Sequence, residues 1–478
     1  MKKMYKTVIG LEVHLELKTK SKNFSPAENS YSSSPNSNVS VIDLGYPGIL
    51  PTINKEGVKN ALKVALALNC NIPSHLSFDR KNYFYPDLPK GYQITQLNNP
   101  IGTNGYVMIN IDGQDKKILI HDTHLEEDTA SLDHYDTYSL LDYNRCGVPL
   151  LETVTEPCIY SAEEAVAFLE TYKNIALYLG VSDARNDLGQ VRCDVNVSLM
   201  KEGSTTLGTR VEMKNIPSFA AVKASIIAEV KRQTKILEEG GTIEMETRRY
   251  DEATDMTYPL RKKVEAVDYK YYNESNIPRI KLTKDFIETI KKSLPLLAYN
   301  RANKYVNEYN ISRKDANTLT RDKKLSDYFD KVLDGKISPI TASNYVLNIL
   351  VGNINKLCLE IDKIKITPEE LRGLITKVEQ GNISIKQAKE VINESLEKDI
   401  APSTIIKEKN IMQITNKEEL TNIVNKILDT NPNLVTDYHN GKRVFDYLIG
   451  QIMKETKGKA NPSISSNILK QELERRMN

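Results

Sequence analysis

The chain has 478 residues, of which 40% are hydrophobic and 27% charged, with a formal net charge of +2. A chain of this length is too long for one ordinary hydrophobic core and is predicted to form roughly two to four domains. The small net charge excludes a basic surface over the whole molecule, so any contact with nucleic acid must be made by a local patch. The chain has five cysteines but no C-x-x-C pair, which argues against a disulfide framework and a four-cysteine zinc site. It also has no apolar N-terminal segment and no apolar run long enough to cross a bilayer. We therefore expect a cytoplasmic protein with no membrane segment.

The first part of the chain mixes strand and helix patterns. Strands are predicted at residues 7–17, 101–122, 191–200 and 209–213, and apolar residues at helical spacing predict a helix at 56–69. This mixture is typical of an α/β domain.

Two longer helices have recognisable ends. Ser161 is expected to begin one of them in a capping box with Glu164, and Gly180 to end it. Ser218 is expected to cap the other helix, which ends at a glycine pair beginning with Gly240.

From about Lys281 the strand patterns fade and short helices take over. Thr367 and Pro368 start one helix, Gly381 follows its end, and residues 399–403 are expected to be a linker. Helical segments follow at 417–428, 444–456 and 465–475. The predicted fold class is α+β, with a mixed α/β domain over 1–293, an all-α helical domain over 294–400 and a small all-α tail domain over 401–478.

The segment Asp79–Gln93 has an unusual composition. It contains four aromatic residues, three cations and two acids around two prolines. The prolines restrict the backbone, and the apolar run of a core strand is missing, so the segment is predicted to be a stiffened loop. Such a loop either positions catalytic side chains or is a surface loop whose tyrosines pack along the protein.

The alternation at Gly10–Glu16 places Glu12, His14 and Glu16 on one face of the first strand. This face is either an ordinary solvated surface or part of a functional site. Two further features favour the second interpretation.

The first is an acidic cluster at His124–Asp128, and the second is a pair of carboxylates, Glu152 and Asp194, in similarly polar stretches. Carboxylate oxygens are natural ligands for Mg²⁺, especially where a nucleotide supplies phosphate oxygens. The alternative for His124–Asp128 is an exposed acidic turn.

Several common catalytic motifs are missing from the sequence. It contains no G-x-x-x-x-G-K-[ST] loop, no G-x-G-x-x-G after a strand and no G-x-S-x-G elbow. Cys146 has no activating base beside it and is interpreted as a small buried thiol. Residues 442–478 carry eight Lys or Arg against four Asp or Glu, which suits either phosphate-backbone contacts or an ordinary charged helical surface.

Taken together, seven blocks strongly resemble the B-subunit family of the aspartyl/glutamyl-tRNA(Asn/Gln) amidotransferases, over essentially the whole chain. The blocks are V-I-G-L-E-V-H at Val8–His14, D-R-K-N-Y-F-Y-P-D-x-P-K-x-Y-Q at Asp79–Gln93, H-L-E-E-D at His124–Asp128, N-R-x-G-x-P-L-x-E at Asn144–Glu152, R-C-D-x-N at Arg192–Asn196, E-M-K-N at Glu212–Asn215 and G-K-A-N-P at Gly458–Pro462.

The resemblance implies an ATP- and Mg²⁺-dependent ligase that works on misacylated tRNA. In such enzymes the side-chain carboxylate of Glu-tRNA(Gln) or Asp-tRNA(Asn) is phosphorylated, and ammonia then displaces the phosphate. The ammonia comes from glutamine hydrolysis in an amidase-type A subunit, and a small C subunit completes a heterotrimer. The α/β domain would be the catalytic cradle, and the tail domain would contact tRNA.

The resemblance also assigns roles to individual residues. Metal ligands are expected at Glu12, His14, Glu127, Glu152 and Asp194. Catalytic side chains of the pocket and channel mouth are expected at Lys81, Tyr83, Tyr85, Lys90 and Glu126. Contacts to the nucleotide phosphates or the tRNA end are expected from Arg192, Lys214 and Arg261.

The chain departs from the family pattern at two places. Paired cysteines that many members carry near positions 24–44 are missing, so no structural zinc is expected. The block at 267–276 lacks the usual arginine, phenylalanine and two prolines, which is expected to alter local contacts and loop stiffness. One alternative is therefore a diverged tRNA-binding scaffold without kinase activity. The archaeal Glu-tRNA-specific relative is disfavoured because the chain has no room for its large insertion.

Overall fold

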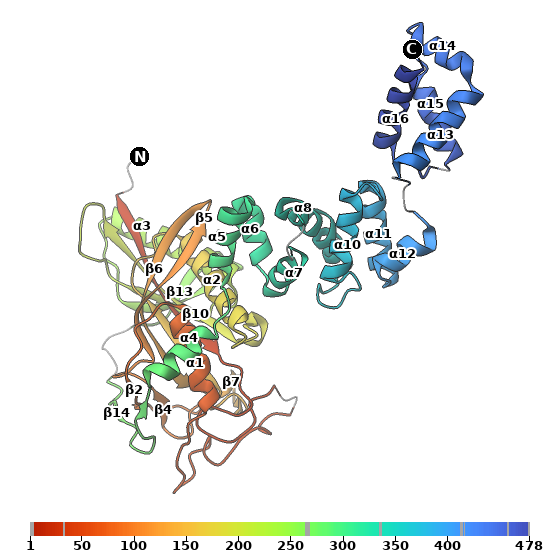
Figure 1. Cartoon of the computed structure of the whole chain (residues 1–478). Helices are drawn as coiled ribbons and strands as arrows, with labels where there is room; N and C mark the ends of the chain where they lie inside the picture. Colours follow the sequence, from red (N-terminus) through yellow and green to blue (C-terminus); the bar gives the residue numbers. More distant parts are fainter. Residues whose placement is uncertain are drawn as a thin grey trace. The chain divides into compact units, whose positions relative to one another are not determined.

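The computed structural model describes residues 4–31, 34–262, 268–333, 337–411, 414, 416–456 and 458–476, with only the backbone described for 261 and 262. The chain divides into two compact units, residues 1–300 and 301–478 (Figure 1). The first unit combines sheets with helices and the second is helical, so the fold class is α+β as predicted.

One large sheet is the framework of the first unit. Its strands are β1 (Tyr5–Glu16), β5 (Gly102–Ile111), β6 (Gln114–Glu127), β9 (Pro149–Thr155), β10 (Val191–Lys201), β11 (Val211–Met213), β12 (Glu246–Asp251) and β13 (Met256–Lys262). Their order is β13-β12-β11-β10-β1-β9-β6-β5, and neighbours are antiparallel except for the parallel pair β11 and β12. Strand β1 is therefore central, and chain segments far apart in sequence meet beside it.

Three small sheets accompany the large one. They pair β3 (Asp79–Asn82) with β14 (Tyr272–Asn273) and with β4 (Tyr92–Thr95), β15 (Ile280–Lys281) with β2 (His75–Leu76), and β7 (Ser131–His134) with β8 (Ser139–Asp142). The segment predicted as one stiffened loop is thus a strand at its start and at its end. The prediction missed this because backbone pairing with β4 and β14, rather than an apolar pattern, makes residues 79–82 extended.

Helices pack on the apolar face of the large sheet. They are α1 (Lys55–Ala67), α2 (Ala162–Leu179) and α3 (Phe219–Glu238), with α4 (Lys284–Lys292) against α1 and a short 3₁₀ turn at Asn186–Leu188. Leu11, Val13 and Leu15 of β1 are at most 1% exposed in the resulting core. Because side chains alternate along a strand, the other face of β1 carries its polar residues.

The helix ends follow the predicted signals, with one difference. Ser161 Oγ accepts the Glu164 N–H at 3.1 Å, and Gly180 ends α2 in the left-handed conformation. The Glu164 carboxylate, however, accepts the N–H of Tyr160 at 2.6 Å, one residue before the position that a capping box requires. Ser218 Oγ accepts the Ala221 N–H at the start of α3.

The second unit consists of short helices. They are α5 (Ala298–Tyr309, which begins in the first unit), α6 (Arg313–Thr320), α7 (Lys323–Leu333), α8 (Pro339–Asn344), a π-helical segment (Tyr345–Val351), α9 (Gly352–Lys356), α10 (Pro368–Glu379), α11 (Ile385–Lys398), α12 (Pro402–Lys409), α13 (Lys417–Thr430), α14 (Pro432–His439), α15 (Phe445–Glu455) and α16 (Pro462–Arg475). One hydrophobic cluster lies within residues 302–406 and another within 420–473. The expected linker at 399–403 is only a turn, because Pro402 starts α12.

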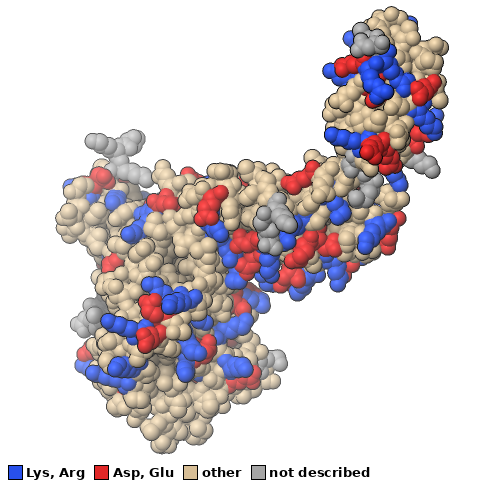
Figure 2. Space-filling view, in the orientation of Figure 1, with Lys and Arg blue, Asp and Glu red and all other residues tan. Residues whose placement is uncertain are grey.

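None of the helices in the described part of the chain combines the length and the apolar character needed to cross a bilayer. Figure 2 shows acidic and basic side chains interspersed over the face that it draws, in both units.

Candidate active site on the polar face of the sheet

Four neighbouring strands place polar side chains in a row on the face of the sheet opposite the helices. His14 of β1 is paired with Arg192 of β10 on one side and with Glu152 of β9 on the other. Glu152 is in turn paired with His124 of β6. Residues paired across neighbouring strands share a face. The register thus brings together residues from four blocks of the sequence.

His14, Glu126 and Glu152 form a compact group in which one ligand atom from each lies within 4.8 Å of the others. His14 Nε2 lies 3.2 Å from Glu152 Oε2 and 4.0 Å from Glu126 Oε1. The Thr95 hydroxyl donates to Glu126 Oε2 at 3.3 Å. Two carboxylates and an imidazole at this spacing fit a divalent cation.

The row continues to His124, which sequence reasoning did not single out as a ligand. His124 Nε2 lies 3.4 Å from Glu152 Oε2 and 3.9 Å from Glu126 Oε2, and its Nδ1 lies 2.8 Å from Asp122 Oδ1. The signal was present in the sequence, because alternation along 122–127 puts Asp122, His124 and Glu126 on one face. The interpretation of His124–Asp128 as an acidic cluster did not take this alternation into account.

Burial and charge act in opposite directions on the pKa values of this group. Burial opposes the imidazolium forms of both histidines, but the surrounding carboxylates, Glu152 foremost, together outweigh burial and raise the pKa of His14 and, more strongly, of His124. Burial also opposes ionisation of Glu152, yet the two imidazoles hold its pKa well below the usual range. Burial and the Glu152 charge raise the pKa of Glu126. Glu152 is therefore the persistent anion at the centre of the site.

A second row lies beside the first. Glu12 is paired with Asp194 across β1 and β10, and Glu12 Oε1 accepts from Asn196 Nδ2 at 2.9 Å. Burial, followed by the Glu152 charge, raises the pKa of Glu12. The ammonium of Lys214 donates to Asp194 Oδ2. The structure thus brings Glu12, Asp194 and Lys214 together next to the His14 group.

Glu127 points to the opposite face of β6 from Glu126. Its Oε2 accepts from Lys90 Nζ at 2.6 Å, and its Oε1 accepts the Ile94 N–H at 3.0 Å. Burial opposes the ammonium form of Lys90, but Glu127 outweighs it and raises the pKa of Lys90. The structure brings Glu127 to Lys90 rather than to the group around His14, and its role as a metal ligand stays a prediction.

Lys81 and Tyr83 lie near the carboxylates, beside the altered block. Burial opposes the charge of Lys81, but Glu126 together with Tyr271 and Glu152 outweighs burial and raises the pKa of Lys81. Lys81 Nζ lies 5.0 Å from the centre of the Tyr269 ring, which also meets the Tyr83 ring edge-on at 6.1 Å. Burial raises the pKa of Tyr83. Tyr85, in contrast, is 45% exposed on the loop between β3 and β4.

The described part of the altered block, 268–276, is tied to β3. The fully buried carboxylate of Glu274 accepts from Arg80 Nε at 2.5 Å and from Arg80 Nη2 at 3.1 Å. The Asn82 N–H donates to the Tyr269 carbonyl at 3.0 Å. The block therefore positions the backbone next to Lys81. Residue 267 lies outside the described residues.

The remaining predicted contacts with phosphate or the tRNA end differ in their surroundings. Arg192 Nη2 donates to Asp128 Oδ2 at 2.7 Å, and Arg145 Nε lies 3.7 Å from the same oxygen. Arg192 thus lies in the same row as His14 but is engaged by a carboxylate. The side chain of Arg261 lies outside the described residues.

The segment in which many family members carry paired cysteines is fastened here by a buried ion pair. Lys22 Nζ lies 3.3 Å from Asp43 Oδ2, and the two side chains are 0% and 2% exposed. The Ser40 N–H donates to Asp43 Oδ2 at 2.9 Å. Gly147 packs against this pair, and a Cβ there would lie 2.7 Å from Asp43 Oδ1. Phe24 and Asp43 do not provide a thiolate donor set for zinc, and the absence of zinc stays a prediction.

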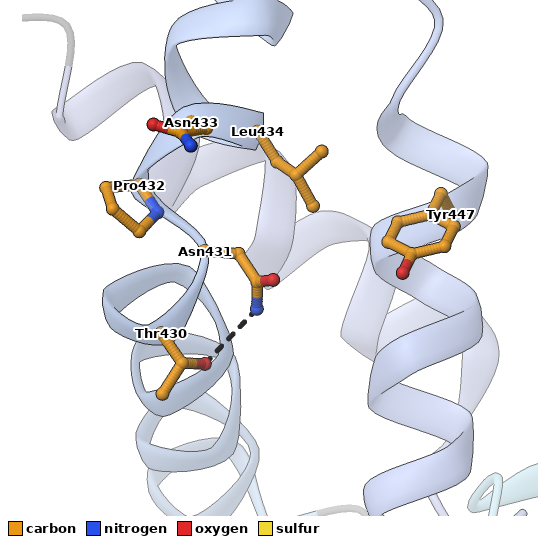
Figure 3. A pocket seen from close by; sticks show the side chains of 6 residues that line it. All are labelled: Thr430, Asn431, Pro432, Asn433, Leu434 and Tyr447. Carbon is orange, nitrogen blue, oxygen red and sulfur yellow. Dashed lines mark hydrogen bonds between the residues drawn. The ribbon is translucent and has the colours of Figure 1, made fainter.

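A surface hollow of about 420 Å³ in the second unit provides a contrast (Figure 3). It is lined by Thr430, Asn431, Pro432, Asn433, Leu434 and Tyr447. These side chains include no carboxylate, imidazole or cation, so this hollow offers none of the groups that phosphoryl transfer needs.

Comparison with known proteins identifies the family. The family model described as the GatB/GatE catalytic domain matches residues 7–288, and the model described as the GatB domain matches residues 327–473. The B subunits of the aspartyl/glutamyl-tRNA(Asn/Gln) amidotransferases from Geobacillus thermodenitrificans and Oceanobacillus iheyensis are each 46% identical to the chain, and the one from Bacillus licheniformis is 44% identical. Each alignment covers 99% of this chain and 100% of the relative. The chain therefore belongs to the B-subunit family of the aspartyl/glutamyl-tRNA(Asn/Gln) amidotransferases.

Proposed function

We propose that the chain is the ATP-dependent kinase and transamidase subunit of a glutamine-dependent tRNA amidotransferase. Its substrates are misacylated Glu-tRNA(Gln), Asp-tRNA(Asn) or both. The terminal phosphoryl group of ATP is transferred to an oxygen of the side-chain carboxylate, and ADP leaves. Ammonia then attacks the carbonyl carbon of the acyl phosphate, the C–O bond to phosphate breaks, and the amide forms.

The observation that carries this proposal is the group formed by His14, Glu126 and Glu152, whose ligand atoms lie within 4.8 Å of one another. Phosphoryl transfer depends on positioning and on neutralising phosphate charge more than on covalent help from the protein. Mg²⁺ held by these residues would supply positive charge that neutralises the phosphate groups. Glu12 and Asp194 in the neighbouring row add negative charge, either as direct ligands or through water.

Cationic side chains complete the proposed pocket. Lys81, close enough to Glu126 for the carboxylate to raise its pKa, stays protonated and can hold the activated carboxylate or a phosphate oxygen. Lys214 and Arg192 flank the carboxylate rows, where they are paired with Asp194 and Asp128. They can contact phosphate or the tRNA end if these ligands replace the two aspartates as their partners. Arg261 and Tyr85 are assigned to the same surface by family resemblance.

The proposed assembly is a cytoplasmic heterotrimer. An amidase-type A subunit supplies ammonia by hydrolysing glutamine, a small C subunit completes the complex, and the tail domain at 401–478 contacts tRNA. The buried pair of Lys90 and Glu127 lies behind the pocket, on the opposite face of β6 from Glu126, and would border the path that ammonia takes. The reaction class is an ATP-dependent carbon–nitrogen ligase with glutamine as amido donor.

The decisive experiment measures phosphate transfer and amide formation on misacylated tRNA. The chain is co-expressed with its A and C partners and supplied with Mg²⁺, ATP and glutamine. Glu126→Gln and Glu152→Gln are expected to abolish both reactions while tRNA binding persists, because they remove charge at the carboxylates and little volume. Glu163→Gln is the matched control, since Glu163 is exposed on α2 and pairs with Lys223 of α3, away from the carboxylate rows.

The opposite result is equally clear. Tight binding of misacylated tRNA by the intact complex without ATP turnover would contradict the proposal and indicate a diverged scaffold. The altered block at 267–276 would then be the first region to restore to the usual family sequence.

A further inference from the structure

The imidazole of His124 is held in one orientation by Asp122. His124 Nδ1 lies 2.8 Å from Asp122 Oδ1, and Asp122 Oδ2 lies 2.7 Å from Nδ1 of the exposed His121. A carboxylate that accepts from Nδ1–H leaves Nε2 as the nitrogen that can offer a lone pair. The side chain of His124 is 16% exposed, so the surrounding protein restricts the other orientations that its ring could adopt.

This Nε2 atom faces the same carboxylates as His14 does. The two imidazole nitrogens lie 3.4 Å (His124) and 3.2 Å (His14) from one oxygen, Glu152 Oε2. They face different oxygens of Glu126, with His124 at 3.9 Å from Oε2 and His14 at 4.0 Å from Oε1. Strand β9 lies between β1 and β6, so His14 and His124 come from the strands on either side of Glu152.

We propose that His124 is a second imidazole ligand of the divalent cation at the His14, Glu126 and Glu152 group, and that Asp122 is the positioning residue that orients it. The inference rests on the proposed function in one respect, namely that this group binds a cation. His124 Nε2 lies 3.4 Å from Glu152 Oε2 and 3.9 Å from Glu126 Oε2, so it is within reach of the two carboxylates that would hold the cation. A carboxylate behind a ligating imidazole is a common arrangement in metal sites.

The donor set has a consequence for the kind of ion. Mg²⁺ prefers oxygen ligands, whereas imidazole nitrogens favour first-row transition ions. Two imidazoles and two carboxylates therefore bind Mn²⁺, Fe²⁺ or Zn²⁺ more tightly than Mg²⁺. The ion class expected at this position is a divalent transition metal, and Mg²⁺ occupies it with lower affinity.

The test uses Mn²⁺ alone as the probe on the intact complex of the chain with its A and C partners. Pulsed electron paramagnetic resonance detects coupling of the Mn²⁺ electrons to ¹⁴N of bound imidazole. We expect couplings from two imidazoles in the wild type, from one in His14→Gln or His124→Gln, and from none in the double variant.

Mn²⁺ affinity gives a second readout. His124→Gln is expected to weaken binding about 10- to 100-fold and Asp122→Asn about 10-fold, the range typical of lost ligands or of lost groups behind them. His121→Gln is the matched control. Its imidazole contacts the other oxygen of Asp122 and is 63% exposed, so Mn²⁺ affinity should not change.

The outcomes separate this inference from the proposed function. A wild-type spectrum with one imidazole that His124→Gln leaves unchanged would overturn the role of His124 while preserving the metal site. Absence of Mn²⁺ binding at the cluster would overturn both. If His124→Gln fails to fold in circular dichroism melting, the wild-type spectrum and Asp122→Asn still decide the question.

Discussion

Lys90 and Glu127 form an ion pair that is almost completely removed from solvent, with side chains 3% and 1% exposed. A buried charge is costly unless it is matched, and the Ile94 N–H helps to satisfy the Glu127 carboxylate. This pair lies directly behind Glu126, so the strand that carries the proposed metal ligands is anchored on its other side by opposite charges.

Breaking the Lys90–Glu127 pair is expected to destabilise the chain strongly. Lys90→Met or Glu127→Gln alone leaves one buried charge unmatched and should lower the free energy of unfolding by about 3 to 5 kcal/mol. The double variant should lose less than the sum of the singles, because no charge is left unpaired. Chemical denaturation of all four proteins, followed by far-ultraviolet circular dichroism, gives the coupling energy. Additive single effects would contradict the prediction.

The ion pair of Lys22 and Asp43 predicts how the chain responds to metal removal. Because the segment is fastened by buried charge, metal analysis of the His14→Gln/His124→Gln double variant, which lacks the imidazoles of the other cation site, should find no stoichiometric zinc. A chelator such as EDTA should leave the melting temperature of that variant unchanged. Asp43→Ala should instead destabilise by about 3 kcal/mol or more, since Lys22 is then buried alone. Stoichiometric zinc, or melting induced by the chelator, would refute this prediction.

Thiol reactivity should depend on pH in a defined direction. Burial, reinforced by the Glu127 charge, raises the pKa of Cys146 to about 12, against roughly 8.5 for a free thiol. The contribution of the neutral thiol to the free energy of unfolding is thus fully present below about pH 8.5, and it is lost as the pH rises toward 12. At pH 8 iodoacetamide should label the exposed Cys358 while Cys146 stays unmodified, as mass spectrometry of tryptic peptides can show.

The matched control for this labelling is Cys358→Ser. It should remove the rapid modification of the native chain and leave the slow labelling of the buried thiols unchanged. Rapid modification of Cys146 in the folded protein at pH 8 would show that its environment is more open or more positive than the structure indicates.

Lys81 should act on the reaction more than on tRNA binding. Lys81→Met removes the cation near Glu126 but keeps the aliphatic stem beside the Tyr269 ring, so we expect amide formation to slow about 100-fold with little change in the KM for misacylated tRNA. Lys81→Arg should retain part of the rate because the charge persists. Equal losses in both variants would point to a requirement for shape rather than charge.

The amino-acid sequence determined the local features of the protein because their causes are local. Period-two alternation placed Glu12, His14 and Glu16 on one face of a strand, and hydroxyl caps marked the starts of the long helices at Ser161 and Ser218. The blocks of the family were also readable without a structure, since each is a short continuous run. The α+β class followed from the change of pattern near residue 281.

Only the tertiary structure decided which blocks meet and on which side. Strand register, which depends on backbone pairing between distant segments, put Glu152 between His14 and His124. Alternation on β6 sent Glu126 toward that site and its neighbour Glu127 to the opposite face, where Lys90 neutralises it. Charge and burial at a single residue depend on partners brought from elsewhere in the chain, and no local pattern in the sequence records them.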